Sequence, residues 1–229
     1  MIGIIGAMDV EIQGMVANMQ IYEQKNVSNI TFYKGTLENK DVVIAKCNPG
    51  KVNAAICAQT MILLFDVDAI INTGVAGNLS KELSICDVAI AKDVVQHDMD
   101  TSPLGDPVGY ISGIDVVRIN ADERICALLG ECAKGCDDTN VKTGTIASGD
   151  QFLNSSEVKE KIVSDFDAIA GEMEGASIGH VAYANGIPFG VLRVISDNAD
   201  GESDMDFPQF CKVAADKSIK ICMEFVRRF

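Results

Sequence analysis

The sequence predicts an α/β fold in which a largely parallel or mixed sheet is covered by helices on both faces. Short apolar runs with strand character alternate with segments of helical periodicity along all 229 residues. No change of composition, internal repeat or low-complexity tract marks a linker, so a single domain spanning residues 1–229 is expected. Several strand-like runs end in small or polar residues, and ligands of open α/β sheets bind at such strand ends.

The N-terminal part of the chain is predicted to form a strand, a helix and a hairpin. Residues 1–6 are apolar and end at Gly6, which indicates a buried strand, and residues 7–19 carry apolar side chains at helical spacing. Residues 30–35 and 41–47 are predicted strands, because Glu38, Asn39 and Lys40 between them have the character of a hairpin turn.

The middle of the chain is predicted to contain a long helix, two strands and an irregular loop. Pro49 and Gly50 precede the apolar helix 52–65, and residues 69–72 form a short strand that runs into a glycine-rich loop, 73–78. Residues 87–95 are a second strand. Segment 101–113 contains two prolines and three glycines and is expected to be irregular.

The C-terminal part continues the alternation of the two element types. The predicted helices are 121–132, 155–163, 176–184 and 207–229, of which the second begins with Ser-Ser-Glu, a plausible N-cap. The predicted strands are 141–147, 167–171 and 189–195.

Composition narrows the classes of partner. The net charge of −14 disfavours nucleic acids and acidic membrane surfaces, which attract basic proteins, and favours a small-molecule partner. No apolar run is long enough to span a membrane, so a cytoplasmic protein with eight reduced cysteines is expected. The two histidines lie far apart and away from the cysteines, so no metal site and no cofactor are predicted.

Three carboxylates lie at the ends of apolar runs. A role in folding alone does not explain charged side chains at these places. Glu172 and Glu174 are two residues apart and share a face of an extended segment, and Asp197 follows the most apolar strand. Such groups often perform acid–base chemistry, because partial burial raises one pKa while a neighbouring group stays ionised. Arg193 lies in the same strand, where its charge requires a partner, either structural or in a site.

Six motifs then stand in the order and spacing of 5'-methylthioadenosine/S-adenosylhomocysteine nucleosidases, which the chain resembles from the first strand to the last helix. They are Gly3 to Glu11, Gly50 to Ala55, Ile71 to Gly77, Ser148 to Phe152, Glu172 to Glu174, and Ser196 with Asp197. The resemblance implies a three-layer α/β/α sandwich with a central mixed, twisted sheet, as in nucleoside phosphorylases. It also implies hydrolysis of an adenine N-glycosidic bond through an oxocarbenium-like transition state.

The resemblance assigns roles to most of the candidate residues. Asp197 would protonate N7 of adenine, Glu174 would hold the ribose hydroxyls, and Glu11 would be the base for the attacking water, which Arg193 would help to place. Glu172 would support these groups or lie at the adenine edge. The remaining substrate-binding residues would be Met8, Val75, Gly77, Phe152, Leu153, Met173, Ser196 and Phe207. Of these, Phe152 would stack on adenine, the Leu153 backbone would read the adenine edge, Met173 would pack on the ribose, and Met8 and Phe207 would line the 5'-thio pocket.

A homodimer is also implied, with the site completed by a segment of the neighbouring subunit around His97, Thr101 and Leu104. The chain departs from the family where Val75 replaces a serine thought to position water, and where Pro49, Thr101 and Leu104 replace other residues near the 5' group. These departures bear on the water site and on the preferred 5' substituent.

Three alternatives were weighed against hydrolysis of methylthioadenosine and adenosylhomocysteine. A nucleoside phosphorylase is disfavoured because the loop 72–78 holds no cation for phosphate. A futalosine-type hydrolase differs only in the base and the 5' group, so these motifs do not separate it from the first reading. A non-catalytic nucleoside-binding protein is disfavoured, because it has little physical reason to keep Glu11, Glu174 and Asp197 together.

Overall fold

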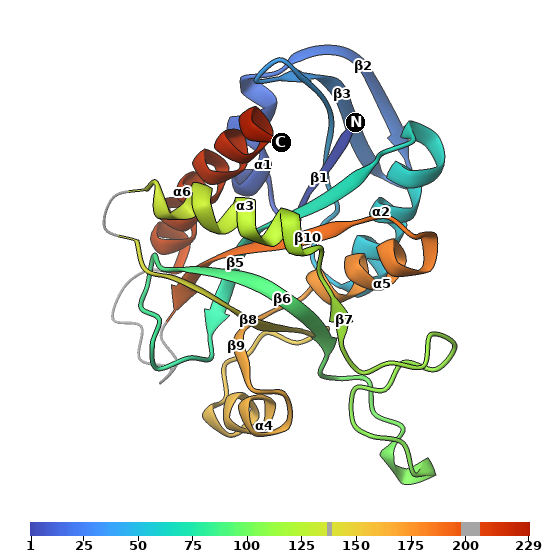
Figure 1. Cartoon of the computed structure of the whole chain (residues 1–229), viewed down its shortest axis with the longest axis vertical. Helices are drawn as coiled ribbons and strands as arrows, with labels where there is room; N and C mark the ends of the chain where they lie inside the picture. The colour runs from blue at the N-terminus through green and yellow to red at the C-terminus, as the bar shows by residue number, and fades with distance from the viewer. Residues whose placement is uncertain (137–138, 198–206) are drawn as a thin grey trace.

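The computed structural model describes residues 1–136, 139–197 and 207–229 and shows a mixed α/β architecture (Figure 1). In these residues the strands form one mixed sheet: β1 (Ile2–Gly6), β2 (Gln20–Val27), β3 (Ile30–Leu37), β4 (Lys40–Lys46), β5 (Ala69–Asn78), β6 (Val88–Gln96), β7 (Ile119–Asn120), β8 (Val141–Ser148), β9 (Ala168–Glu172) and β10 (Phe189–Asp197). The helices are α1 (Asp9–Ala17), α2 (Lys51–Phe65), α3 (Glu123–Lys134), α4 (Ser156–Phe166), α5 (Gly175–Asn185) and α6 (Phe207–Arg228), with a 3-10 turn η1 (Ser102–Leu104).

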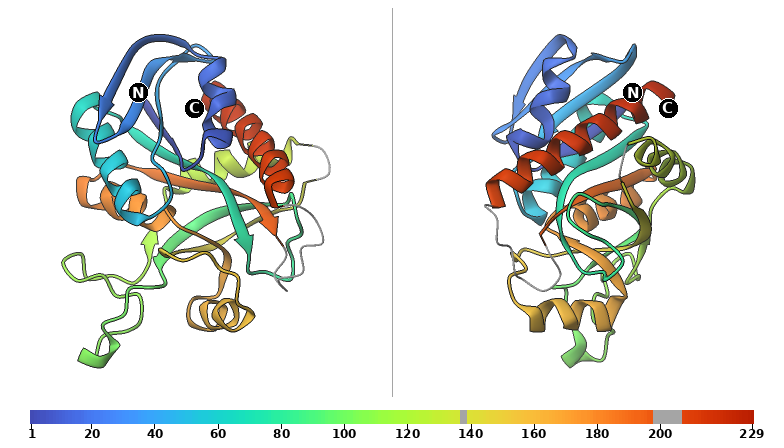
Figure 2. Two further views of the ribbon diagram at one scale, coloured as in Figure 1. Left: turned by 180° about the vertical axis from the view of Figure 1, so that it is seen from behind. Right: turned by 90° about the vertical axis from the view of Figure 1, so that its left-hand side faces the viewer.

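Helices cover both faces of the sheet, as the sequence predicts. Successive strand residues point to opposite faces, so in β1 the side chain of Ile4 joins one apolar cluster and that of Ile5 the other. The Ile4 cluster is completed by α1, α3 and α6, and the Ile5 cluster by α2 and α5 (Figure 2). A third, smaller cluster packs α4 against the ends of β6 and β8.

β10 is a central strand although it comes late in the sequence. It pairs in parallel with β5 and antiparallel with β6, and so lies between them. β5 in turn pairs with β1 along residues 69–72 and then, beyond the end of β1, with β9 through Gly77 and Gly171. The sheet therefore partly closes on itself through β5, β10, β6, β8 and β9.

Most predicted elements are confirmed, with small differences at their ends. The hairpin of β3 and β4 has the predicted turn, in which Glu38 and Asn39 adopt positive φ angles of 49° and 62°. The loop predicted at 73–78 is wrong, because these residues continue β5 and form hydrogen bonds with β9 and β10. The sequence predicts neither β2 nor β7. β2 is a polar edge strand with almost no buried side chain, so it carries no apolar signal.

Two further observations concern the residues that the structure describes. None of their helices is long and apolar enough to cross a membrane, and they include no cluster of His, Cys, Asp or Glu able to hold a metal ion. All eight cysteines are free thiols.

Candidate active site

A pocket of about 210 Å³ opens where the carboxyl ends of β1, β5, β9 and β10 converge. Its lining brings together most of the predicted site residues: Met8, Glu11, Val75, Gly77, Phe152, Leu153, Glu172, Met173, Glu174, Arg193, Ser196 and Asp197. A larger groove of about 480 Å³ runs along α3 but is lined by none of them. The smaller pocket is therefore the candidate site.

Glu11 is held by backbone N–H groups from two strand ends. Ala7 and Met8 donate to Oε2 over 2.7 and 2.9 Å, and Val75 donates to Oε1 over 3.0 Å. The side chain is buried, and burial raises its pKa above the ordinary 4.5, while the charge of Arg193 and the three N–H groups oppose that rise. Glu11 is thus a fixed, desolvated carboxylate facing the pocket.

Val75 positions Glu11 through its backbone rather than its side chain. Its N–H holds the carboxylate, and its carbonyl accepts a hydrogen bond from Arg193 over 3.4 Å. The preceding residue, Gly74, is also required by space, because a Cβ there would lie 2.4 Å from an oxygen of Glu11 and 2.5 Å from Arg193 Nη1. Both contacts use backbone atoms, so they do not depend on the side chain at position 75.

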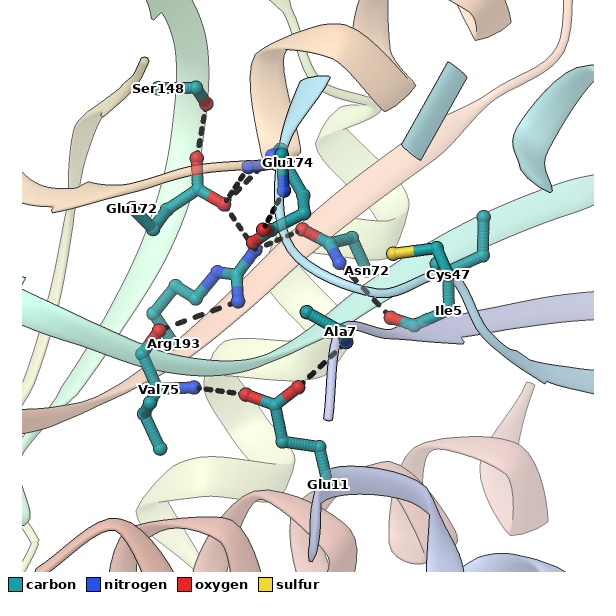
Figure 3. A network of polar contacts seen from close by, with 12 residues as sticks. Ile5, Ala7, Glu11, Cys47, Asn72, Val75, Ser148, Glu172, Glu174 and Arg193 are labelled. Atoms are coloured by element: carbon teal, nitrogen blue, oxygen red, sulfur yellow. Dashed lines mark hydrogen bonds and ion pairs between the residues drawn. The ribbon is translucent and has the colours of Figure 1, made fainter. Parts of the chain in front are cut away.

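Arg193 is fully buried and joins the two glutamates of the predicted motif (Figure 3). Its Nη2 donates to Glu172 Oε2 and to the amide oxygen of Asn72, and it lies 3.5 Å from Glu174 Oε2. Glu172 also accepts hydrogen bonds from the Ser148 hydroxyl and from the backbone of Glu174 over 2.9 Å. Glu172 is therefore saturated and anchors Arg193, which supports a positioning role for it rather than a catalytic one.

Glu174 has one oxygen close to Arg193 and the other bound by the backbone. The Gly50 N–H, at the start of α2, donates to Oε1 over 3.0 Å. Burial, and then the negative charge of Glu172, raise its pKa to about 7, against the attraction of Arg193. This carboxyl group titrates near neutral pH, which is typical of active-site acids.

The raised pKa of Glu174 makes the stability of the protein depend on pH. Between its ordinary 4.5 and about 7 the folded state binds more protons than the unfolded state, so stability falls as pH rises through this window. In wild type, this group should lower the free energy of unfolding by about 3 kcal/mol as the pH rises through the window. We expect Glu174→Gln to lack this pH-dependent loss. Urea unfolding at a series of pH values measures it, with Glu82→Gln as the control, since the Glu82 side chain is 76 % exposed. Equal pH slopes in wild type and Glu174→Gln would contradict this expectation.

Asp197 lies at the end of β10 and pairs with a buried lysine of α4. Lys159 Nζ is 3.3 Å from Asp197 Oδ2, and the lysine side chain is 6 % exposed. Burial raises the pKa of Asp197, whereas the Lys159 ammonium and the Asn78 N–H lower it. Gly77 lies against this carboxyl group: a Cβ at position 77 would approach Asp197 Oδ1 to 3.3 Å, a tight contact.

The walls of the pocket come from apolar and aromatic residues. Phe152 lines it and is 64 % exposed. Leu153 packs its side chain close to Gly171, and Met8 and Met173 line the same pocket. Phe207, predicted to line the 5' side, lies outside the residues whose side chains are described.

The segment predicted to serve a neighbouring subunit stays outside this pocket. The His97 ring packs on Gly149, and the Thr101 hydroxyl donates to Asp106 over 2.8 Å. Leu104 is 83 % exposed. Within one chain these three residues do not meet the residues around Asp197.

Sequence reasoning missed several groups that hold the site. Asn72, which binds Arg193 and the Ile5 carbonyl, was read only as part of a glycine-rich motif. The contribution of Gly50 is a backbone N–H, which no side-chain pattern reveals. Lys159 belongs to an ordinary run of alternating charges, Glu157 to Lys161, and nothing in that run marks it as buried.

Comparisons with known proteins show the family of the chain as a whole. The family model described as "Phosphorylase superfamily" matches residues 1–227. An aminodeoxyfutalosine nucleosidase of Helicobacter pylori is 41 % identical over 98 % of this chain and 97 % of its own length. A 5'-methylthioadenosine/S-adenosylhomocysteine nucleosidase of Exiguobacterium is 36 % identical over 99 % of this chain and 97 % of its own.

Solved structures of nucleosidases share the fold of the whole chain. The nucleosidase of Neisseria meningitidis in complex with methylthio-immucillin-A is 34 % identical, with a TM-score of 0.94 over 100 % of this chain and 99 % of that one. A futalosine hydrolase of Helicobacter pylori is 40 % identical, with a TM-score of 0.92 over 100 % of this chain and 97 % of that one. The chain therefore belongs to the phosphorylase superfamily, among the 5'-methylthioadenosine/S-adenosylhomocysteine and aminodeoxyfutalosine nucleosidases.

Proposed function

We propose that the protein hydrolyses the N-glycosidic bond of adenine nucleosides that carry a 5' substituent, with 5'-methylthioadenosine and S-adenosylhomocysteine as substrates. One observation carries the proposal: Glu11, Glu174 and Asp197 line a single pocket, and burial raises the pKa of each of them. A protein that only bound a nucleoside would gain nothing from holding three such carboxyl groups there.

Loss of adenine is faster when the base leaves as a neutral molecule than when it leaves as an anion. In the proposed mechanism the Asp197 carboxyl group gives its proton to N7 of adenine while the glycosidic electron pair moves to the base. Asp197 suits this role because burial keeps its pKa raised and because it shares the pocket with Phe152, on which adenine would stack. General acid catalysis of this type contributes about 10²–10⁴ in rate.

The ribose carries positive charge in the transition state, and the other two carboxylates oppose it. Glu174 would bind the ribose hydroxyls, with Met173 packed on the sugar. Glu11 would take a proton from water as the water oxygen bonds to C1'. The rigid backbone cradle of Glu11 suits a base that must be aimed at one position.

Hydrolysis is favoured over phosphorolysis by the charge of the pocket. Arg193 is the only cationic side chain in the described lining, and it is engaged by Glu172 and Glu174. A phosphate nucleophile needs unengaged cations or bidentate arginines to balance its charge. Three buried carboxylates around the same space would repel it.

Aminodeoxyfutalosine is a second candidate substrate. The Helicobacter pylori relatives favour it, since they include an aminodeoxyfutalosine nucleosidase, a futalosine hydrolase and a 5'-methylthioadenosine nucleosidase. The residues assigned here to the base and ribose would serve either substrate, so the preference lies on the 5' side, near Met8 and Pro49.

We further propose that the active form is a homodimer. α2 and α5 are joined by hydrogen bonds between Gln59 and Asn185, on the side from which segment 99–118 projects (Figures 1 and 2). Large apolar side chains are exposed on these parts: Val52, Leu63, Leu104 and Tyr183. A second copy of the chain packed on this side would bury these side chains. Its Leu104 would then lie near the active-site pocket of the first copy. A mass of one chain by light scattering would contradict the dimer.

The test is adenine release from 5'-methylthioadenosine, S-adenosylhomocysteine and aminodeoxyfutalosine, each with and without phosphate. We expect release without phosphate and no ribose 1-phosphate in either condition. A strict requirement for phosphate would overturn the hydrolase assignment. Binding without any release would favour the non-catalytic alternative, and the ranking of the three kcat/KM values identifies the preferred 5' group.

A further inference from the structure

Lys159 is placed where a lysine is costly unless it has a specific partner. It lies in the first turn of α4, where the helix dipole disfavours a cation, and its side chain is 6 % exposed. Within the described residues its ion pair is with Oδ2 of Asp197, which comes from a different element and lines the pocket. The other lysine of the same helix, Lys161, instead is 68 % exposed and pairs with Asp165.

We propose that Lys159 is a positioning residue that orients the carboxyl group of Asp197 and sets how strongly it donates its proton to the departing base. This inference rests on the function proposed above. By engaging Oδ2, the ammonium fixes the orientation of the carboxyl group. When the proton moves to the base, the carboxylate that remains is stabilised by the adjacent positive charge, so the transfer becomes more favourable.

Among the residues that the structure describes, Lys159 is the charged group paired with Asp197. From β5, Asp197 faces Gly77 and the Asn78 N–H, from its own strand the Ser196 hydroxyl, and from α6 the Cys211 thiol. Glu11, Glu172, Glu174 and Arg193 share the same pocket. Burial raises the pKa of Asp197, and Lys159 is the largest influence that lowers it.

The expected consequence is a change in pH dependence that a purely structural lysine would not produce. In Lys159→Met the carboxyl group becomes a weaker acid, so the alkaline limb of kcat/KM moves up by about one pH unit, while kcat at neutral pH falls. Lys159→Gln, which keeps a hydrogen-bond donor but no charge, should move the limb in the same direction. Lys161→Met, which removes a charge from the same helix, should leave the profile unchanged.

A second measurement does not depend on turnover. The Asp197 carboxyl resonance is identified in the ¹³C spectrum of the intact protein by its loss in Asp197→Asn, and its pKa is followed in each lysine variant. The proposal expects this pKa to rise in Lys159→Met and Lys159→Gln. If both folded variants keep the wild-type carboxyl titration and the wild-type alkaline limb, the proposal is overturned. A wild type without nucleosidase activity would refute the proposed function, while the carboxyl titration would still test the lysine.

Discussion

The Asp197→Asn variant is expected to lose adenine release from its substrates, with kcat lowered by about 10²–10⁴-fold. An amide has nearly the same shape as the carboxyl group but has no acidic proton to give to N7. The substrate contacts made by Phe152, Glu174 and Met173 remain, so affinity for an unreacted nucleoside should be largely retained. Steady-state kinetics and calorimetric titration with 5'-methylthioadenosine measure the two effects separately.

Asp165→Asn is the matched control for this variant. Asp165 lies on α4 and pairs with Lys161 at the protein surface, away from the pocket. Its replacement should leave kcat equal to that of the wild type within experimental error, because Asp165 does not line the pocket. Exposed ion pairs of this kind contribute about 0–1 kcal/mol to stability, so the variant should also stay folded. Turnover of Asp197→Asn at the level of this control would remove Asp197 from the mechanism.

The Arg193→Met variant is expected to lose about 3–5 kcal/mol of folding free energy. Methionine fills much of the same volume, but Glu172 and Glu174 would remain buried without the cation that joins them. Asn72 would also lose the donor to its amide oxygen. The loss should be smaller at low pH, where Glu174 binds a proton and one negative charge fewer is left buried without its cation.

Urea unfolding at pH 5 and pH 8 measures this loss, with Arg227→Met as the control. Arg227 pairs with Glu38 and Glu224, but its side chain is 57 % exposed, so its replacement should change stability by less than about 1 kcal/mol. An equally small change in Arg193→Met would contradict this expectation. It would show that the attraction within the buried ion pairs only balances the cost of removing their charges from water, so that Arg193 does not stabilise the fold.

The fold was predictable where local pattern and tertiary environment agree. β1 and the centre of β4 are continuous apolar runs and are buried as expected. α2 is a largely apolar helix that begins after Pro49 and Gly50, and it buries one face. The polar edge strand β2 has no such pattern, since its pairing with β3 comes from the backbone. Residues 73–78 were read as a loop because glycine signals a turn, whereas here it makes room for Glu11 and Arg193 beside a strand.

The sequence predicts which residues form the site, but it does not predict which of them form hydrogen bonds and ion pairs with one another. The carboxylates could be found because charge at the end of an apolar run is unusual, and the family resemblance connected them. Which carboxylate pairs with Arg193 depends on the register between β5 and β10 and on the place of Glu172 at the end of β9, and the sequence around Arg193 reveals neither of them. For the same reason, nothing in the sequence connects Lys159 with Asp197.

The position of β10 between β5 and β6 has a consequence for synthesis of the chain. Until residues 189–197 have left the ribosome, β5 and β6 each present an unpaired edge of apolar sequence, which is a hazard for aggregation. The pairing also joins segments more than a hundred residues apart, so folding of this sheet should be slow compared with folding of a local hairpin. A nascent chain of this protein should therefore be a client for chaperones until its last strand is inserted, and only then acquire Asp197 and the site.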